Sequence, residues 1–325
     1  MTSAMALRTP ATAPATLGFG TGSLGSVIGY RAGCLLVEAA FDAGFRHFDV
    51  APPYGNGAAE CILGDVLASV RAQVVLVSKV GFMHPRGGGL VNVLRRVASP
   101  LKQALPGLWG RAAQRTRLLT APAGSFTPAE IKASIAESLR RLRTDRLDAL
   151  LLHEASAQAL ADNTVVALLD AQREGLVGGL GTGTGLAATL DLHTRYADWL
   201  SWAQVPHWPA AFDPRLRRPS LQLCTHGSLR TAAPFLAALG MTPDAHVDEL
   251  RQALADPPTR VRLLVQSALH HVGPGGVVVV STTRADHARE LARVAADALP
   301  ADLINSMNDG LAAAASKSDM SFMPA

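Results

Sequence analysis

Val74-Val-Leu-Val-Ser-Lys79 is a short, mostly apolar and β-branched run that ends in a lysine, and Leu147-Asp-Ala-Leu-Leu-Leu-His153 is a second mostly apolar run, which ends in a histidine. Such runs are typical of strands in a parallel sheet with helices on both faces. Longer segments with apolar residues at helical spacing lie between them. One begins at Thr127-Pro-Ala-Glu130, a capping box with proline at the first helical position. The alternation predicts βαβ units.

About eight strand–helix units can be placed along the chain. Expected strands are residues 17–20, 46–49, 74–79, 147–153, 176–181, 202–205, 221–224 and 277–280. Expected helices are residues 35–43, 58–70, 128–142, 165–174, 261–270 and 285–296. This count predicts an α/β fold, a (β/α)8 TIM barrel in a single domain over residues 17–300. A doubly wound open sheet is the alternative. A flexible tail is expected at residues 1–16 and a C-terminal tail at residues 301–325, flexible from Ala312 onward.

Composition excludes several classes of protein. The chain has 325 residues, of which 48% are hydrophobic and 17% charged, so it is neither disordered, collagen-like nor a disulfide-framed miniprotein. A net charge of +4 is too small to indicate nucleic acid binding. The chain lacks an apolar run long enough to cross a membrane. Cys34, Cys61 and Cys224 are unpatterned, which favours reduced thiols in the cytoplasm and no zinc site. We also expect no signal peptide.

Two segments interrupt the alternation of strands and helices, and each of them follows an expected strand. Residues 82–126 contain no Asp or Glu and seven basic residues, which predicts a basic insertion after the third strand. Residues 206–219 carry Arg215, Arg217 and Arg218. Each segment is either a solvated surface loop or a lid that favours an anionic or bulky substrate.

Four polar residues follow successive strands of the expected barrel. Asp49, Lys79 and His153 end three of these strands, and Tyr54 lies in the turn after Asp49. Neighbouring parallel strands bring their ends to one rim, so we expect an Asp–Lys ion pair there. We expect the lysine to lower the pKa of the Tyr54 phenol from about 10, which would make it a general acid. The histidine could hydrogen-bond a carbonyl oxygen. Together these groups suit the protonation of a carbonyl.

The chain resembles the aldo/keto reductases in four stretches. These are Gly18-Phe-Gly-Thr21, Gly44-Phe-Arg-His-Phe-Asp49-Val-Ala-Pro-Pro-Tyr54-Gly-Asn-Gly-Ala-Ala-Glu60, Ser78-Lys79-Val-Gly81 and the 147–153 strand. The resemblance implies a TIM barrel, no metal, and NAD(P)(H)-dependent reduction of an aldehyde or ketone to an alcohol, or the reverse oxidation. It assigns Tyr54 as the proton donor, with Lys79, Asp49 and His153 as its partners.

The resemblance also implies a set of cofactor-binding residues. These are Gly20, Thr21, Asp49, Thr184, Gln204, Ser281, Thr282, Thr283, Arg284, His287 and Glu290. The chain departs from the family pattern after the fifth strand, where Gly183-Thr184 replaces a Ser-Asn pair. It also lacks the aromatic residue after the seventh strand, for which only His226 could substitute. Leu291 replaces an asparagine of the adenine site.

Arg284 and Arg289 are either surface charges of a helix or ligands of a 2′-phosphate, which prefers a guanidinium and would favour NADP(H) over NAD(H). Ser281-Thr-Thr-Arg284 before a helix is a suitable anion site. The glycine-rich residues 178–185 do not fit G-x-G-x-x-G, which disfavours a Rossmann dehydrogenase. No tyrosine is followed four residues later by lysine, which disfavours the short-chain dehydrogenases.

We therefore predict an oxidoreductase with Tyr54 as general acid, acting on a small-molecule carbonyl or alcohol. Two alternatives stay open: a barrel that serves as a cofactor-binding or regulatory subunit with little turnover, and a lyase- or isomerase-type barrel without nicotinamide. The sequence identifies neither the substrate nor the oligomeric state.

Overall fold

The computed structural model describes residues 13–81, 126–208, 213–229, 250, 252–297 and 299–317. The predicted basic insertion therefore lies outside the described residues, apart from Phe126. Most of the predicted N-terminal tail does as well. No helix of the described part of the chain is both long and apolar enough to span a membrane.

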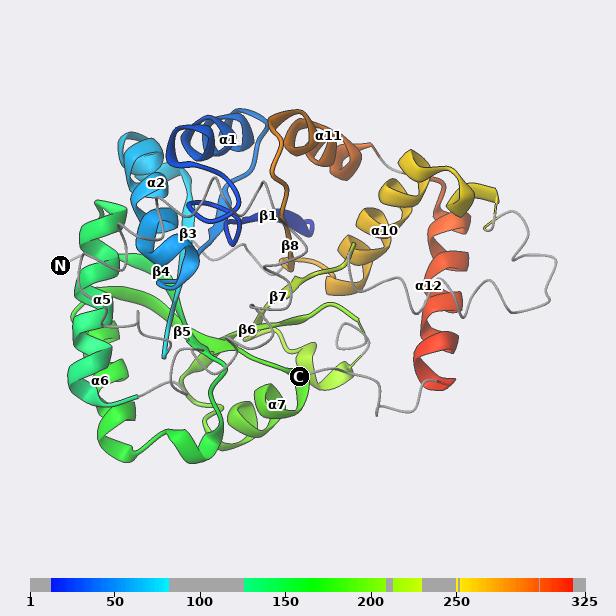
Figure 1. Ribbon diagram of the computed structural model, residues 1–325. Coiled ribbons are helices and arrows are strands. Elements are labelled where there is room, and N and C mark those ends of the chain that lie inside the picture. Colours follow the sequence, from blue (N-terminus) through cyan, green and yellow to red (C-terminus); the bar gives the residue numbers. More distant parts are fainter. Residues whose placement is uncertain are drawn as a thin grey trace, which may run out of the picture.

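Eight parallel strands close into a barrel in the order of the sequence, with β8 paired to β1 (Figure 1). The strands are β1 (Thr16–Gly20), β2 (His47–Asp49), β3 (Val75–Val80), β4 (Leu147–His153), β5 (Val177–Gly183), β6 (Leu200–Pro206), β7 (Gln222–His226) and β8 (Val277–Val280). The predicted TIM barrel is confirmed, and the open-sheet alternative is wrong because the sheet has no free edge.

Helices surround the barrel (Figure 1). The α-helices are α1 (Tyr30–Asp42), α2 (Ala58–Leu67), α5 (Pro128–Leu142), α6 (Asp162–Arg173), α7 (Leu186–Arg195), α10 (Pro257–Val272), α11 (Ala285–Ala296) and α12 (Ala301–Lys317). Short 3-10 helices are η1 (Tyr54–Gly57), η2 (Ala68–Gln73), η4 (Ala157–Ala159) and η6 (Pro214–Leu216). The capping box begins α5 as expected: Thr127 Oγ1 accepts the Glu130 N–H at 3.4 Å and donates to Glu130 Oε2 at 2.6 Å.

The barrel interior is filled by side chains rather than open. One buried cluster comprises Val77, Ala149, Leu151, Trp202, Cys224, Val277 and Val279, all from strands β3 to β8. A larger apolar cluster packs the outer faces of the strands against the helices. Because the interior is closed by packing, polar side chains gather where the strands end, and the site lies at that rim.

The C-terminal segment differs from its predicted tail. Residues 301–317 form helix α12, which packs against α10 (Figure 1). Ile304 and Met307 are buried in a cluster with Trp208 and Leu263. Their spacing with Leu303 makes an apolar stripe at helical period, which buries surface that a free tail would expose. Helix α7 was also absent from the predicted elements.

Candidate active site

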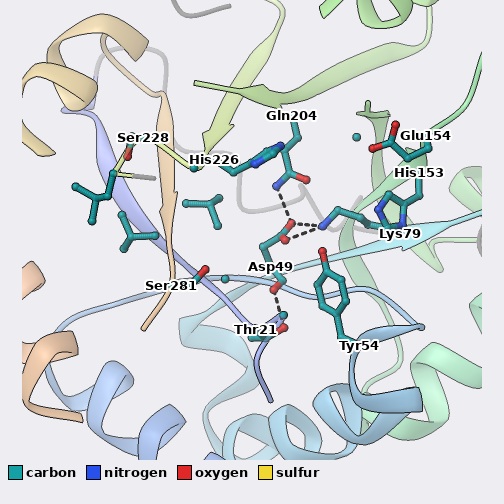
Figure 2. A pocket seen from close by; sticks show the side chains of 17 residues that line it. Thr21, Asp49, Tyr54, Lys79, His153, Glu154, Gln204, His226, Ser228 and Ser281 are labelled. Carbon is teal, nitrogen blue, oxygen red and sulfur yellow. Dashed lines mark hydrogen bonds and ion pairs between the residues drawn. The ribbon is translucent and has the colours of Figure 1, made fainter. Parts of the chain in front are cut away.

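Three strand ends bring charged and polar groups together at the carboxyl rim of the barrel. Asp49 ends β2, Lys79 lies next to the end of β3, and His153 ends β4. Lys79 Nζ donates to Asp49 Oδ1 at 2.6 Å and to Oδ2 at 2.7 Å (Figure 2). The same ammonium lies 5.6 Å from the centroid of the Tyr54 ring. The predicted juxtaposition of the four residues is present.

Tyr54 is presented by a turn whose backbone suits its sequence. The next three residues, Gly55, Asn56 and Gly57, have φ angles of 57°, 55° and 87°, all left-handed. Glycine and asparagine are the residues that adopt this region at least cost. A Cβ on Gly57 would lie 2.3 Å from Arg141 Nη1, so the guanidinium packs directly on this turn. The Tyr-Gly-Asn-Gly sequence thus fixes where the phenol points.

The Tyr54 pKa differs from its sequence-based expectation. Burial of the phenol raises its pKa above the usual value of about 10, although the Lys79 ammonium opposes this. Burial alone would lower the pKa of Lys79, but the Asp49 carboxylate outweighs it and raises that pKa. The expectation of a lowered Tyr54 pKa is wrong because it counted the lysine and omitted desolvation. Tyr54 is therefore protonated, and Lys79 charged, at neutral pH.

His153 is uncharged at neutral pH. Burial, with the Lys79 charge beside it, lowers the pKa of its imidazole to about 4. A neutral imidazole has one N–H to donate and cannot act as a strong acid at pH 7. The site thus holds a protonated phenol, Tyr54, next to a charged ammonium and a neutral hydrogen-bond donor.

A cavity of about 360 Å³ opens onto these groups. The predicted site residues that line it are Gly20, Thr21, Asp49, Tyr54, Lys79, His153, Gln204 and Ser281. Gly183 and His226, which the sequence analysis named as replacements for family residues, also line it. The lining residues that the prediction omitted are Gly22, Glu154, Gly227, Ser228, Leu229, Val279 and Val280. Thr184 adjoins the cavity through a hydrogen bond to Glu154. The predicted residues outside the lining are Thr282, Thr283, Arg284, His287 and Glu290.

Beside the ion pair, the cavity is lined by bare backbone at Gly183. Gly183, at the end of β5, carries no side chain, and a Cβ there would lie 3.5 Å from Lys79 Cε and 3.6 Å from Gln204 Oε1. Gln204 Nε2 donates to Asp49 Oδ2 at 2.8 Å, which leaves its Oε1 available to accept. Bare backbone beside an amide oxygen fits a planar ring that bears a carboxamide.

The polar side chains at the start of α11 form hydrogen bonds within this segment. Thr282 Oγ1 accepts the Arg284 N–H at 3.2 Å. The Arg284 guanidinium donates to the Asp286 carboxylate, with Nη2 2.5 Å from Oδ2 and Nε 3.1 Å from Oδ1. Both side chains are largely exposed, so this ion pair is weak and exchangeable. A phosphate at this helix start would compete with Asp286 for Arg284.

Comparison with known proteins supports the same family. Residues 16–202 match the model of the aldo/keto reductase family, more than half of the chain, and the chain belongs to that family. A D-threo-aldose 1-dehydrogenase from Pseudomonas sp is 32% identical over 199 residues, covering 56% of this chain and 54% of that protein. A pyridoxal 4-dehydrogenase from Microbacterium luteolum is 28% identical over 151 residues, covering 45% and 41%. The chain thus matches about half the length of these curated relatives.

Solved structures share the fold. An aldo-keto reductase from Klebsiella pneumoniae in complex with NADPH has a TM-score of 0.62 at 22% identity, covering 91% of this chain and 90% of that one. A glycerol dehydrogenase from Gluconobacter oxydans has a TM-score of 0.65 at 18% identity, covering 95% of both chains.

Proposed function

We propose that the protein is an NAD(P)(H)-dependent oxidoreductase that reduces an aldehyde or ketone to an alcohol, or catalyses the reverse reaction. The buried Lys79–Asp49 pair beside Tyr54 and His153, in one cavity, carries this proposal. Family membership and the dehydrogenase activities named for the two curated relatives support it.

Tyr54 is the general acid of the proposed reaction. Bound nicotinamide supplies the hydride to the carbonyl carbon, and the Tyr54 hydroxyl gives its proton to the carbonyl oxygen. The neutral His153 donates an N–H to the same oxygen and orients it. The Lys79 ammonium stabilises the phenolate left behind, and Asp49 keeps that ammonium charged inside the barrel. Protonation and charge stabilisation therefore come from separate groups.

The same cavity suits the cofactor. We assign the nicotinamide to the bare backbone at Gly183, with the Gln204 amide oxygen accepting from its carboxamide and Thr184 in place of the missing amide side chain. Gly20, Thr21 and Ser281 line the path toward α11. Beyond it, we assign the phosphates and adenosine to Thr282, Thr283, Arg284, His287 and Glu290. Helix starts attract anions.

Cofactor preference provides a test of the α11 assignment. We propose NADP(H) over NAD(H), with Arg284 binding the 2′-phosphate in exchange for Asp286. Arg284→Ala should raise the KM for NADPH about tenfold and leave that for NADH within about twofold, because only NADPH carries the extra phosphate. Arg293→Ala, an exposed arginine in the last turn of the same helix, is the control. Equal effects on both cofactors would place the 2′-phosphate elsewhere.

The pH dependence should differ between the two directions. Because the Tyr54 pKa lies above its ordinary value, the phenol is protonated below about pH 10, and kcat for reduction should stay flat from about pH 6 to about pH 9. Oxidation of an alcohol requires the phenolate, so its rate should rise with pH, close to tenfold per unit, without a plateau below about pH 10. An oxidation plateau near neutral pH would mean that the Tyr54 pKa is lowered.

A direct assay separates this proposal from the two alternatives. NADPH and NADH fluorescence titrations show whether the cofactor binds, and a panel of aldehydes, ketones, sugars and pyridoxal shows whether it is oxidised. Saturable binding with turnover supports the enzyme. Binding without turnover across the panel favours a regulatory subunit, and no binding leaves only a barrel without nicotinamide.

A further inference from the structure

Glu154, the residue after His153, has an unusual backbone conformation at the mouth of the cavity. Its φ is 51°, in the left-handed region, and its N–H donates to the Gly183 carbonyl at 3.1 Å. The non-glycine residues with positive φ in the described part of the chain are Asn56, Arg143 and Glu154. Asn56 belongs to the Tyr54 turn and Arg143 ends α5. A glutamate adopts this backbone conformation at an energetic cost, and residues that bear such a cost are found mainly at functional sites.

The Glu154 side chain faces the reacting groups. It lines the cavity with Tyr54 and accepts a hydrogen bond from the Thr184 side chain. Its charge contributes to the raised pKa of the Tyr54 phenol. Burial in the cavity mouth raises the pKa of the Glu154 carboxyl, and the Thr184 hydrogen bond opposes this.

Within the described residues, Glu154 differs from Asp49, the other carboxylate of the cavity, in having no ion-pair partner. Asp49 pairs with Lys79, so these two charges cancel. Among the residues that the structure describes, Glu154 forms no ion pair, and it lies partly exposed to solvent at the rim of the cavity. The described lining is therefore negative at this end, and one carboxylate oxygen can accept from a ligand.

The position of Glu154 assigns it to the substrate half of the cavity. β4, which leads into Glu154, lies opposite β8 in the closed eight-stranded barrel. Figure 2 shows Glu154 beside His153, on the side of the Lys79–Asp49 pair away from Ser228 and Ser281. The proposed path of the cofactor follows Ser281 toward α11. The part of the cavity near Glu154 is therefore left for the substrate, next to its reacting carbonyl group.

We propose that Glu154 is a specificity-determining residue, whose carboxylate accepts a hydrogen bond from a hydroxyl next to the substrate carbonyl. The substrates are then neutral hydroxy aldehydes or hydroxy ketones, and aldehydes bearing a carboxylate are repelled. The inference rests on the proposed oxidoreductase function and adds a substrate class to it. A carboxylate acceptor discriminates strongly between a substrate with a hydroxyl and its analogue without one.

A pair of substrates that differ by one hydroxyl tests this inference. The ratio of kcat/KM for 2-hydroxypropanal to that for propanal is measured for the wild type and Glu154→Ala. We expect the ratio to fall about tenfold in the variant, since the charged acceptor is lost. Glu154→Gln, which removes only the charge, should raise kcat/KM for the anionic aldehyde glyoxylate about tenfold.

Controls separate the possible outcomes. Glu174→Gln changes an exposed carboxylate that follows α6 and lies outside the cavity lining, and it should alter neither quantity. Glu154→Asn suits the left-handed backbone and should also lower the ratio if Glu154→Ala folds poorly. A ratio within twofold of wild type, with propanal still reduced, overturns the role of Glu154 alone. No NADPH or NADH oxidation by the wild type with any of the three substrates overturns the inference, and none across the whole panel of aldehydes, ketones, sugars and pyridoxal overturns the proposed function as well.

Discussion

Tyr54→Phe is expected to lower kcat for carbonyl reduction about a thousandfold while leaving the dissociation constant for NADPH within about twofold. The substitution removes only the hydroxyl, which is the protonated acid group that lines the cavity beside Lys79 and His153. The ring that packs in the turn before Gly55 stays. Steady-state kinetics and a fluorescence titration with NADPH measure the two effects.

Tyr196→Phe is the matched control, because it deletes the hydroxyl of a tyrosine at the end of α7 that stacks on Trp199 outside the cavity lining. Its kcat should equal that of the wild type. If the Tyr54→Phe variant kept more than about a tenth of the wild-type kcat, the phenol would not be the proton donor of the reaction.

Lys79→Met is expected to have the second-largest effect, on stability as well as on activity. The lysine and Asp49 are almost fully buried, with side-chain exposures of 3% and 7%. Removing the ammonium leaves a carboxylate inside the barrel whose described polar partner is the Gln204 amide. We expect the free energy of unfolding to fall by about 3–5 kcal/mol and kcat by at least about a hundredfold. Denaturant unfolding and steady-state kinetics provide the measurements.

A double variant distinguishes the two roles of this ion pair. Lys79→Met with Asp49→Asn removes both charges, so much of the lost stability should return. Activity should not return, because no ammonium is left to stabilise the Tyr54 phenolate. Stability losses that simply add in the double variant, or a recovery of kcat, would contradict the coupling described above.

Much of the fold could be predicted because the strands are buried on both faces. The 147–153 run is apolar except for Asp148 and the terminal His153, and β4 covers those residues. The same reasoning placed Asp49, Lys79 and His153 at strand ends, and closure of the barrel then brings them together. In a barrel of parallel strands, the ends of neighbouring strands lie close together, so the position of a residue at a strand end predicts its spatial neighbours.

Other features depend on burial or backbone geometry, which the sequence does not display. The rise in the Tyr54 pKa comes from desolvation, and only the neighbouring lysine was visible beforehand. Glu154 was missed since a left-handed residue after His153 leaves no signature in the residue types. Helix α12 was taken for a tail because its apolar stripe around Ile304 and Met307 becomes stabilising only against α10 and Trp208.

The central claim is that this cavity passes hydride from nicotinamide to a carbonyl while Tyr54 supplies the proton. A single-turnover experiment with NADPH deuterated at the transferring position of C4 tests it most directly, by measuring the rate at which deuterium appears on the alcohol carbon of the product. We expect the label to transfer in the wild type and about a thousandfold more slowly in Tyr54→Phe. Failure of the wild type to transfer it, or equal rates in both proteins, would contradict the account.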